Sequence, residues 1–447
     1  MSSLRKPTIR TAVDFIHSLR LDEIPQGALG AARRSLADTI AVGAAGLRTA
    51  NSRIVRDFAA EHHATTGRGA RTLFDGRRLA PAGAAMAGAA TIDSFDAHDG
   101  QRETKGHAGV VVLPALLAFA DEISRGDGRE FLTRFVLGYE IAVRAGIALH
   151  ATVSDYHTSG AWNALGAAAI GARAMHLSGD ETRHALGIAE YYGPRSQMMR
   201  VIDSPSMLKD GATLGAYAGV SAAFLAEAGF TGAPAITVEA PEVASIWGDL
   251  GQRWRMEEQY LKPYPVCRWA QPAIRAALSL QDEIAGRAIE RLRVVTFHEA
   301  TRLAASAPAN TEEAQYALPF PVAAALVHGR VGAEEIDGEG LRNPEVLALA
   351  KTVELVEEAA YNARFPAERL AHVEVTLADG AVLASRTLAA HGDPENPLSE
   401  GELSEKVRLF AEPILGSARA GRILEACEAL PEDAAYRALI EDVLSPA

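Results

Sequence analysis

The stretch ALGAARRSLADTIAVGAAGL at residues 28–47 decides the fold class. Its apolar residues recur at intervals of three and four, which places most of them on one face of a helix, while Arg33, Arg34 and Asp38 fall elsewhere. The small residues on that face allow neighbouring helix axes to approach closely. Residues 28–47 therefore predict a helix that packs tightly among other helices.

Similar small-residue patterns continue along the chain to about residue 228. They include GAAMAGAATIDSF at 83–95, FLTRFVLGYEIAVRAGIALH at 131–150 and GATLGAYAGVSAAFLAEAG at 211–229. Their common period predicts a compact helical bundle with little sheet.

The pattern changes after about residue 262. ERLRVVTFHEA at 290–300 and HVEVTLADGAVLAS at 372–385 alternate as strands do, the second with an Asp379-Gly380 turn typical of a hairpin. Segments that resemble helices lie between them, so this part is predicted to be a small α+β domain. The expected helices cover residues 313–328, 343–349 and 351–360.

Composition and charge exclude several functional classes. The chain of 447 residues carries 44 basic and 57 acidic residues, a formal charge of -13 that disfavours nucleic acid and anionic membranes. Its two cysteines cannot form a disulfide framework. Residues 1–15 contain no apolar leader, and no later run is long enough to span a bilayer. We expect a soluble, cytoplasmic protein.

An unusual group of polar residues lies at positions 91–122, TIDSFDAHDGQRETKGHAGVVVLPALLAFADE. Such a group can ligate a metal, but no HExxH, EF-hand or Cys/His motif is present, and we expect no metal. The aspartates can also serve only as helix caps. His107 is harder to explain structurally, because two glycines flank its segment directly before an apolar run. The group consists of Asp93, Asp96, His98, Asp99, Lys105 and His107.

Four further candidates lie on turns shaped by glycine or proline: His157, Lys209, Lys262 and Arg268. Each one alone is more often a solvated charge or a hydrogen-bonded structural group. Together with His107 they predict a cationic pocket with titratable bases in an acidic protein. Such a pocket suits a di- or tricarboxylate and the removal of a proton next to a carboxylate.

Long ordered motifs in this chain resemble those of the MmgE/PrpD family, which includes 2-methylcitrate dehydratase, cis-aconitate decarboxylase and iminodisuccinate epimerase. The resemblance covers nearly the whole chain. The motifs are IDSFDAH at 92–98, GHAGVVVLPALLA at 106–118, YHTSGAWNALGAAA at 156–169, MLKDGATLGAYAG at 207–219, LKPYPVCRWAQPAI at 261–274, AQYALPFPVAAALVHGRV at 314–331 and HGDPENPLSEGELSEKV at 391–407.

The resemblance implies a mainly α fold in which both chain ends, residues 1–262 and 395–447, form a large helical domain. Residues 263–394 would form a smaller α+β lid, with the active site between the two. It further implies a homodimer without metal or organic cofactor. The active-site residues that it implies are Asp93, His107, His157, Lys209 and Lys262.

Three positions depart from the family pattern. Ala97, Gln271 and Phe320 replace a threonine, a histidine and a tyrosine, which removes groups able to deliver a proton or bind a substrate oxygen. Other polar residues would then supply contacts. The candidate substrate-binding residues are His98, Asp99, Arg102, Arg268, Gln271, Tyr316 and Phe320.

The first hypothesis for function is a lyase that dehydrates a hydroxy di- or tricarboxylate of the 2-methylcitrate type. His107 or His157 would be base or acid, Lys209 and Lys262 would hold carboxylates, and Asp93 would orient an imidazole. The alternatives are an epimerase of a dicarboxylate, a decarboxylase, and a carboxylate-binding protein without catalysis. Product identity separates the enzymes.

Overall fold

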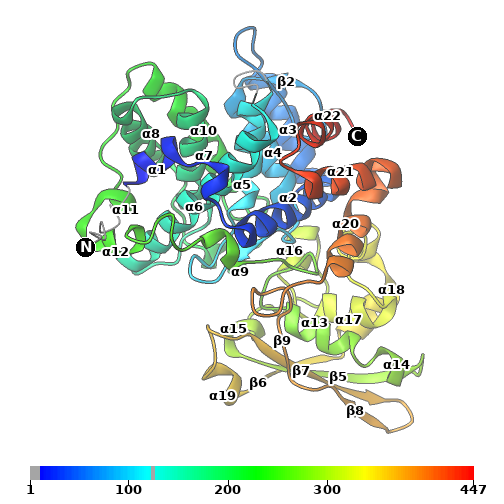
Figure 1. Ribbon diagram of the computed structural model, residues 1–447. Helices are drawn as coiled ribbons and strands as arrows, with labels where there is room; N and C mark the ends of the chain where they lie inside the picture. The colour runs from blue at the N-terminus through cyan, green and yellow to red at the C-terminus, as the bar shows by residue number, and fades with distance from the viewer. Residues whose placement is uncertain (1–10, 122–125) are drawn as a thin grey trace, which may run out of the picture.

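The computed structural model describes residues 11–121 and 126–447. Most of residues 1–15, in which we expect no apolar leader, therefore lie outside the described residues. Helices dominate the described chain, and strands are short or confined to one larger sheet (Figure 1). The prediction of a mainly α protein is confirmed. Within the described ranges, every helix is too short or too polar to cross a membrane.

Small residues bring the helices of the bundle together as the sequence predicts. A methyl group added at Gly46 would overlap the Thr91 carbonyl of a neighbouring helix, and one at Gly219 would overlap the Ala164 carbonyl. The bundle helices are α1 (Ala12–Ser18), α2 (Gln26–Gly46), α3 (Ala50–His62), α4 (Pro81–Asp93), α5 (Gly109–Ala120), α6 (Gly128–Thr152), α7 (Gly160–Ala174), α8 (Gly179–Tyr192) and α10 (Ala212–Glu227).

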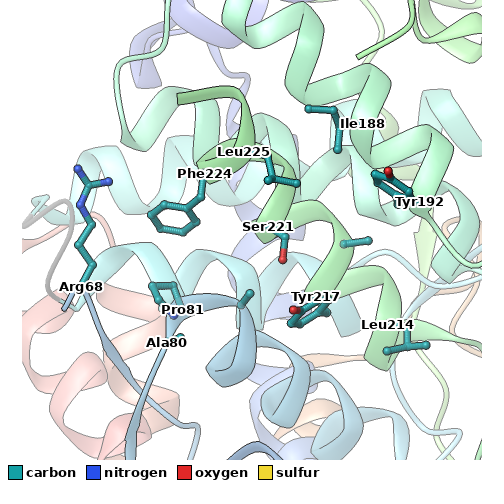
Figure 2. Close-up of a pocket in the computed structure, with 12 residues that line it drawn as sticks. Arg68, Ala80, Pro81, Ile188, Tyr192, Leu214, Tyr217, Ser221, Phe224 and Leu225 are labelled. Carbon is teal, nitrogen blue, oxygen red and sulfur yellow. The ribbon is translucent and has the colours of Figure 1, made fainter. Parts of the chain in front are cut away.

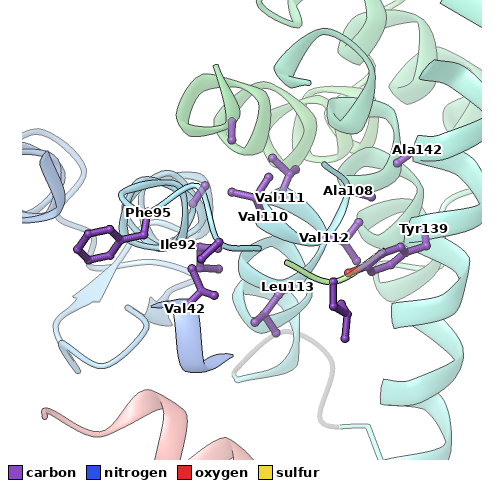
Figure 3. Close-up of a cluster of buried hydrophobic side chains, with 14 of the residues drawn as sticks. Val42, Ile92, Phe95, Ala108, Val110, Val111, Val112, Leu113, Tyr139 and Ala142 are labelled. Carbon is purple, nitrogen blue, oxygen red and sulfur yellow. The ribbon is translucent and has the colours of Figure 1, made fainter. Parts of the chain in front are cut away.

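The core of the bundle surrounds α5, whose twelve residues are all buried. Figure 3 shows the apolar side chains of α5 among those of α2, α4 and α6. α10 packs against α4, α5, α7 and α8. Shorter elements join these helices: β1 (Ala70–Arg71), β2 (Arg78–Leu79), β3 (Gly100–Gln101), α9 (Met199–Asp203), α11 (Ile236–Glu239), α12 (Ala244–Trp247) and β4 (Gln259–Tyr260).

A five-stranded sheet forms the other part of the molecule, at the bottom of Figure 1. The strand order is β6-β5-β7-β8, and β9 also pairs with β7. β5 runs parallel to β6 and antiparallel to β7, and β7 and β8 form the predicted hairpin around Asp379 and Gly380. The strands are β5 (Ile289–Thr296), β6 (Val353–Glu357), β7 (Leu370–Leu377), β8 (Val382–Ala384) and β9 (Leu388–Ala389).

One predicted helix in this part is wrong. Residues 351–360 form strand β6 and the start of a short helix, because the valine-rich segment VELVE pairs with β5. The predicted helix at 313–328 is broken into two, and the one at 343–349 is confirmed. α13 packs on β7 and α17 packs on α13. The helices here are α13 (Gln271–Leu278), α14 (Gln281–Ile284), α15 (His298–Thr301), α16 (Thr311–Gln315), α17 (Pro319–His328), α18 (Pro344–Ala350) and α19 (Ala359–Asn362).

The last three helices return to the first ones. α20 (Glu400–Leu415) and α21 (Ser417–Ala429) pack against α2, and α22 (Asp433–Leu444) packs against α6. Lys406 of α20 pairs with Asp38 of α2, and both side chains are buried. The division of the chain into a separate helical domain and a lid at residues 263–394 stays a prediction.

Candidate active site

A cavity of about 380 Å³ lies where the helical bundle meets the part of the chain that contains the sheet. Two of the predicted active-site residues, His107 and Lys262, line it, as do two predicted substrate-binding residues, Arg268 and Tyr316. The remaining lining residues are Asp96, Lys105, Tyr156, Met198, Met199, Ile202, Tyr260, Cys267, Trp269, Glu299, Arg302, Phe365, Pro366 and Arg369.

The pairing of β3 with β4 brings the two predicted parts of the site together. β3 lies within the polar segment between α4 and α5, and Gly100 and Gln101 pair with Tyr260 and Gln259. Lys262 lies two residues after the end of β4. Its ammonium donates to the carboxylate of Asp96 and, at 3.1 Å, to the Asp96 carbonyl.

Two hydrogen bonds hold His107 in one orientation. Its backbone N–H donates to Ser159 Oγ at 2.9 Å, and its Nδ1 lies 2.5 Å from the carbonyl oxygen of Asp99. Because a carbonyl only accepts hydrogen bonds, Nδ1 carries the proton. Nε2 then has a free lone pair, and it lies 3.6 Å from a carboxylate oxygen of Asp96 and 3.6 Å from one of Asp210.

Burial and charge keep the His107 imidazole neutral. Burial lowers the pKa of His107 to about 3, and the ammonium of Lys262 acts in the same direction. Burial alone would raise the pKa of Asp96, but the ammonium groups of Lys262 and Lys209 act against it and help to bring the pKa well below its usual range. Burial raises the pKa of Asp93 to about 6. An ionised Asp96 therefore lies beside a neutral base.

Lys209 is linked to Asp96 through Gln315. Its backbone has a φ of 47°, a left-handed conformation that is uncommon for lysine. Its ammonium donates to Gln315 Oε1, which also accepts the Asp96 N–H at 2.7 Å. The ammonium also lies 5.3 Å from the centre of the Tyr316 ring, and it does not line the cavity itself.

Asp93, His98 and Asp99 lie behind His107 instead of lining the cavity. His98 Nε2 is 3.4 Å from Asp93 Oδ1, and the His98 ring meets the His107 ring edge to face, with centroids 4.5 Å apart. Asp99 accepts the Gly109 N–H at 3.3 Å, and burial raises its pKa to about 7. These residues position His107.

The structure does not bring four other candidates to the cavity. His157 is half-buried after α6, where its N–H donates to His150 Nε2 at 3.1 Å, so its catalytic role stays a prediction. Arg102 pairs with Glu395. Gln271 uses its amide nitrogen on the carbonyls of Tyr264 and Val266, at 2.8 and 2.9 Å. Phe320 is fully buried in α17.

Sequence reasoning missed several residues of the site. Asp96 was considered only as a metal ligand or a cap. Asp210 and Ser159 were overlooked although both lie inside recognised motifs; Ser159 donates to Asp210, which faces His107. Gln315 also lies in a recognised motif, but Arg369 has no local signal because its neighbours, FPAERL, read as an ordinary surface turn.

Asp96, His98 and His107 bring one potential ligand atom each within 4.8 Å of one another, which makes them a conceivable metal site. The Asp96 carboxylate already accepts a hydrogen bond from the Lys262 ammonium. A divalent cation bound there would be buried beside this positive charge. The donor set thus fits the ammonium better than a metal ion. The expectation of no metal and no cofactor stays a prediction.

A second and larger hollow, of about 720 Å³, lies on the outer surface of the bundle, over α8 and α10 (Figure 2). Its walls are mainly apolar and include the exposed side chains of Tyr192, Leu214 and Leu225. No histidine, lysine or carboxylate of the described residues lines it, and its ionisable side chains are Arg68, Tyr192 and Tyr217. Exposed apolar surface is typical of contact surfaces. The homodimer nevertheless stays a prediction.

Comparison with known proteins shows similarity along nearly the whole chain. The MmgE/PrpD N-terminal domain matches residues 10–244, and the MmgE/PrpD C-terminal domain matches residues 264–431. Cis-aconitate decarboxylase of Homo sapiens is 25% identical over 439 residues, covering 90% of this chain and 87% of the relative. The cis-aconitate decarboxylase-like protein oryM of Aspergillus oryzae (strain ATCC 42149 / RIB 40) is 24% identical over 454 residues, 92% of each chain. Cis-aconitate decarboxylase of Mus musculus is 23% identical over 440 residues, with 92% and 88% covered.

Proposed function

The chain belongs to the MmgE/PrpD family, and from this premise we propose that it is a lyase acting on a hydroxy di- or tricarboxylate. The reaction would remove a proton from a carbon next to a carboxylate and expel water, as in dehydration of 2-methylcitrate. The observation that carries the proposal is His107, whose unprotonated Nε2 lines a buried cavity beside cationic side chains.

His107 is suited to be the base. Its Nδ1–H is fixed on the Asp99 carbonyl, so Nε2 accepts the proton without a change of tautomer. An anionic substrate would add negative charge to the cavity and raise the pKa of His107 from its low value in the empty site. Once protonated, the imidazolium would lie 3.6 Å from both Asp96 and Asp210, whose negative charge stabilises it.

The charge that develops on the substrate carboxylate needs fixed cations. Lys262 and Arg268 line the cavity and would stabilise an enolate-like intermediate in a site of low dielectric constant. Tyr316 also lines it, and burial raises the pKa of this phenol well above its ordinary value. Tyr316 therefore keeps its proton at neutral pH and can donate it to the departing hydroxyl.

Decarboxylation is a second candidate, favoured by the names of the relatives. Three proteins that are 23–25% identical to this chain are called cis-aconitate decarboxylase or cis-aconitate decarboxylase-like. The same cations would hold two carboxylates while a third leaves as carbon dioxide. The carbon would then be protonated by Tyr316, or by His107 once the anionic substrate has led it to take up a proton. Both candidates share proton transfer at a carbon next to a carboxylate.

The test is proton NMR of the protein in deuterated water with citrate, 2-methylcitrate, cis-aconitate and malate. Deuterium should appear next to a carboxylate, with an alkene for a dehydratase and with release of carbon dioxide for a decarboxylase. His107→Gln should lower this rate by about 10²–10⁴-fold. The control is His328→Gln, because His328 lies at the end of α17 outside the cavity. Equal exchange in the wild type and His107→Gln would contradict the assignment.

A further inference from the structure

Five basic side chains line the cavity, and most of their charges are already balanced. Lys262 pairs with Asp96, Arg302 pairs with Asp203, and Arg268 lies 2.7 Å from Asp393. Lys105 is exposed and lies over the ring of Tyr156, 5.3 Å from its centre. The fifth basic residue is Arg369.

Arg369 is buried without an acidic partner. Arg369 is only 9% exposed. Among residues 11–121 and 126–447, no carboxylate pairs with its guanidinium within 4.0 Å. Nη1 donates to the Pro366 carbonyl at 3.1 Å, whereas Nε has no hydrogen-bond partner. The guanidinium therefore has unused donors at the wall of the cavity.

The backbone around Arg369 is firmly held. The residue directly precedes β7, and its carbonyl accepts the N–H of Ala390 at 3.2 Å. The guanidinium also lies 5.8 Å from the centre of the Phe365 ring. A donor placed in this way is ready before a ligand arrives, which reduces the entropy lost on binding.

An unbalanced buried charge is unfavourable unless a ligand supplies the opposite charge. Burial lowers the pKa of Arg369 from its ordinary value, and the positive charge of Arg268 acts in the same direction. Tyr260 and Asp393 act against them, but the Asp393 carboxylate is paired with Arg268. Glu299 is an acidic residue of the same cavity wall, but it does not pair with Arg369. The empty cavity thus favours an anion beside Arg369.

We propose that Arg369 binds a substrate carboxylate other than the one next to the reacting carbon. This inference rests on the proposed function and assigns the residue that recognises the second carboxylate of its di- or tricarboxylate substrate. The planar guanidinium can bind a carboxylate through two parallel hydrogen bonds, which a lysine cannot do. Lys262 reaches the cavity beside His107, whereas Arg369 reaches it from the segment before β7.

Unreactive carboxylates of increasing charge test the inference by calorimetry, without turnover. The probes are butyrate, glutarate and tricarballylate, which carry one, two and three carboxylates. The wild type should bind glutarate and tricarballylate more tightly than butyrate. Arg369→Met should reduce the ratio of glutarate to butyrate affinity at least about 30-fold, because it removes one partner of a buried charge pair.

The matched control is Arg364→Met, five residues earlier, where Arg364 pairs with Glu368 at the surface. This variant should keep the wild-type ratio. An unchanged ratio in Arg369→Met would overturn the inference, and so would a wild type that does not prefer dicarboxylates. Arg369→Lys is a second variant, which keeps the positive charge but loses the planar guanidinium and its two parallel hydrogen bonds. A glutarate-to-butyrate ratio equal to the wild type's in this variant would also overturn the inference.

Thermal unfolding adds a readout that separates binding from a structural role. Ligand-free Arg369→Met should melt at or above the wild-type temperature, because it removes an unbalanced buried charge. A lower melting temperature would count against the inference. Failure of the proposed function has a different signature: the wild type would bind the probes in this order but exchange no carbon-bound proton with any substrate.

Discussion

Loss of the Lys406 ammonium should destabilise the whole protein, because this group joins α20 to both α2 and the active-site segment. Lys406 Nζ lies 2.5 Å from Asp38 Oδ1 and donates to the Ala97 carbonyl at 2.7 Å, all within the core. In Lys406→Met a buried carboxyl and a buried carbonyl both lose their partner. Such a change costs about 3–5 kcal/mol of the free energy of unfolding.

The pKa of Asp38 limits this loss. Burial raises that pKa even with Lys406 beside it, so the carboxyl takes up a proton readily once the ammonium is gone. The destabilisation should therefore be smaller at acidic pH, and the double variant Asp38→Asn/Lys406→Met should recover part of it.

Urea unfolding followed by tryptophan fluorescence measures these differences, since the chain has four tryptophans. The control is Arg422→Met, which removes a pair of Arg422 with Asp442 in which the arginine is mostly exposed. Exposed pairs contribute little, so this variant should unfold almost as the wild type does. An equal loss of stability in Arg422→Met and Lys406→Met would refute the reasoning.

Two further predictions concern stability. Burial raises the pKa of Glu140 from its ordinary value of 4.5 to about 7. Between these two pH values the folded chain keeps a proton that the unfolded chain has released. The wild type therefore loses stability as the pH rises from 4.5 to 7. Measured by urea unfolding, the stability of Glu140→Gln relative to the wild type should therefore rise by about 3 kcal/mol from pH 4 to pH 8. A difference in the free energy of unfolding that stays constant with pH would contradict this. Gly46→Ala should lower the free energy of unfolding by about 1–3 kcal/mol because its methyl group meets the Thr91 carbonyl. Gly30→Ala in the same helix has nothing within 4 Å and should raise it by up to about 1 kcal/mol; thermal unfolding with the opposite order would rule out this account of the packing.

Local features of the sequence predicted much of the architecture. The three- and four-residue spacing at 28–47 predicted α2, and its small residues predicted the close contact that Gly46 makes with α4. The Asp379-Gly380 pair predicted the hairpin of β7 and β8. Residues 351–360 were misread, because VELVE fits a short helix until β5 is present as a hydrogen-bonding partner. Helix periodicity is a local property, whereas strand pairing depends on a distant segment.

The same distinction between local and distant determinants holds for the candidate site. The sequence by itself determined that a polar segment with His107 lies between two buried helices, because those residues are neighbours along the chain. Only the tertiary structure decided that Lys262 bonds to Asp96, 166 residues away, and that Arg369 reaches the same cavity while His157 does not line it. The β3–β4 pairing brings Lys262 close to Asp96, and burial in the folded chain lowers the pKa of His107. Both depend on segments that meet only when the chain is folded, so spacing along the sequence cannot specify them.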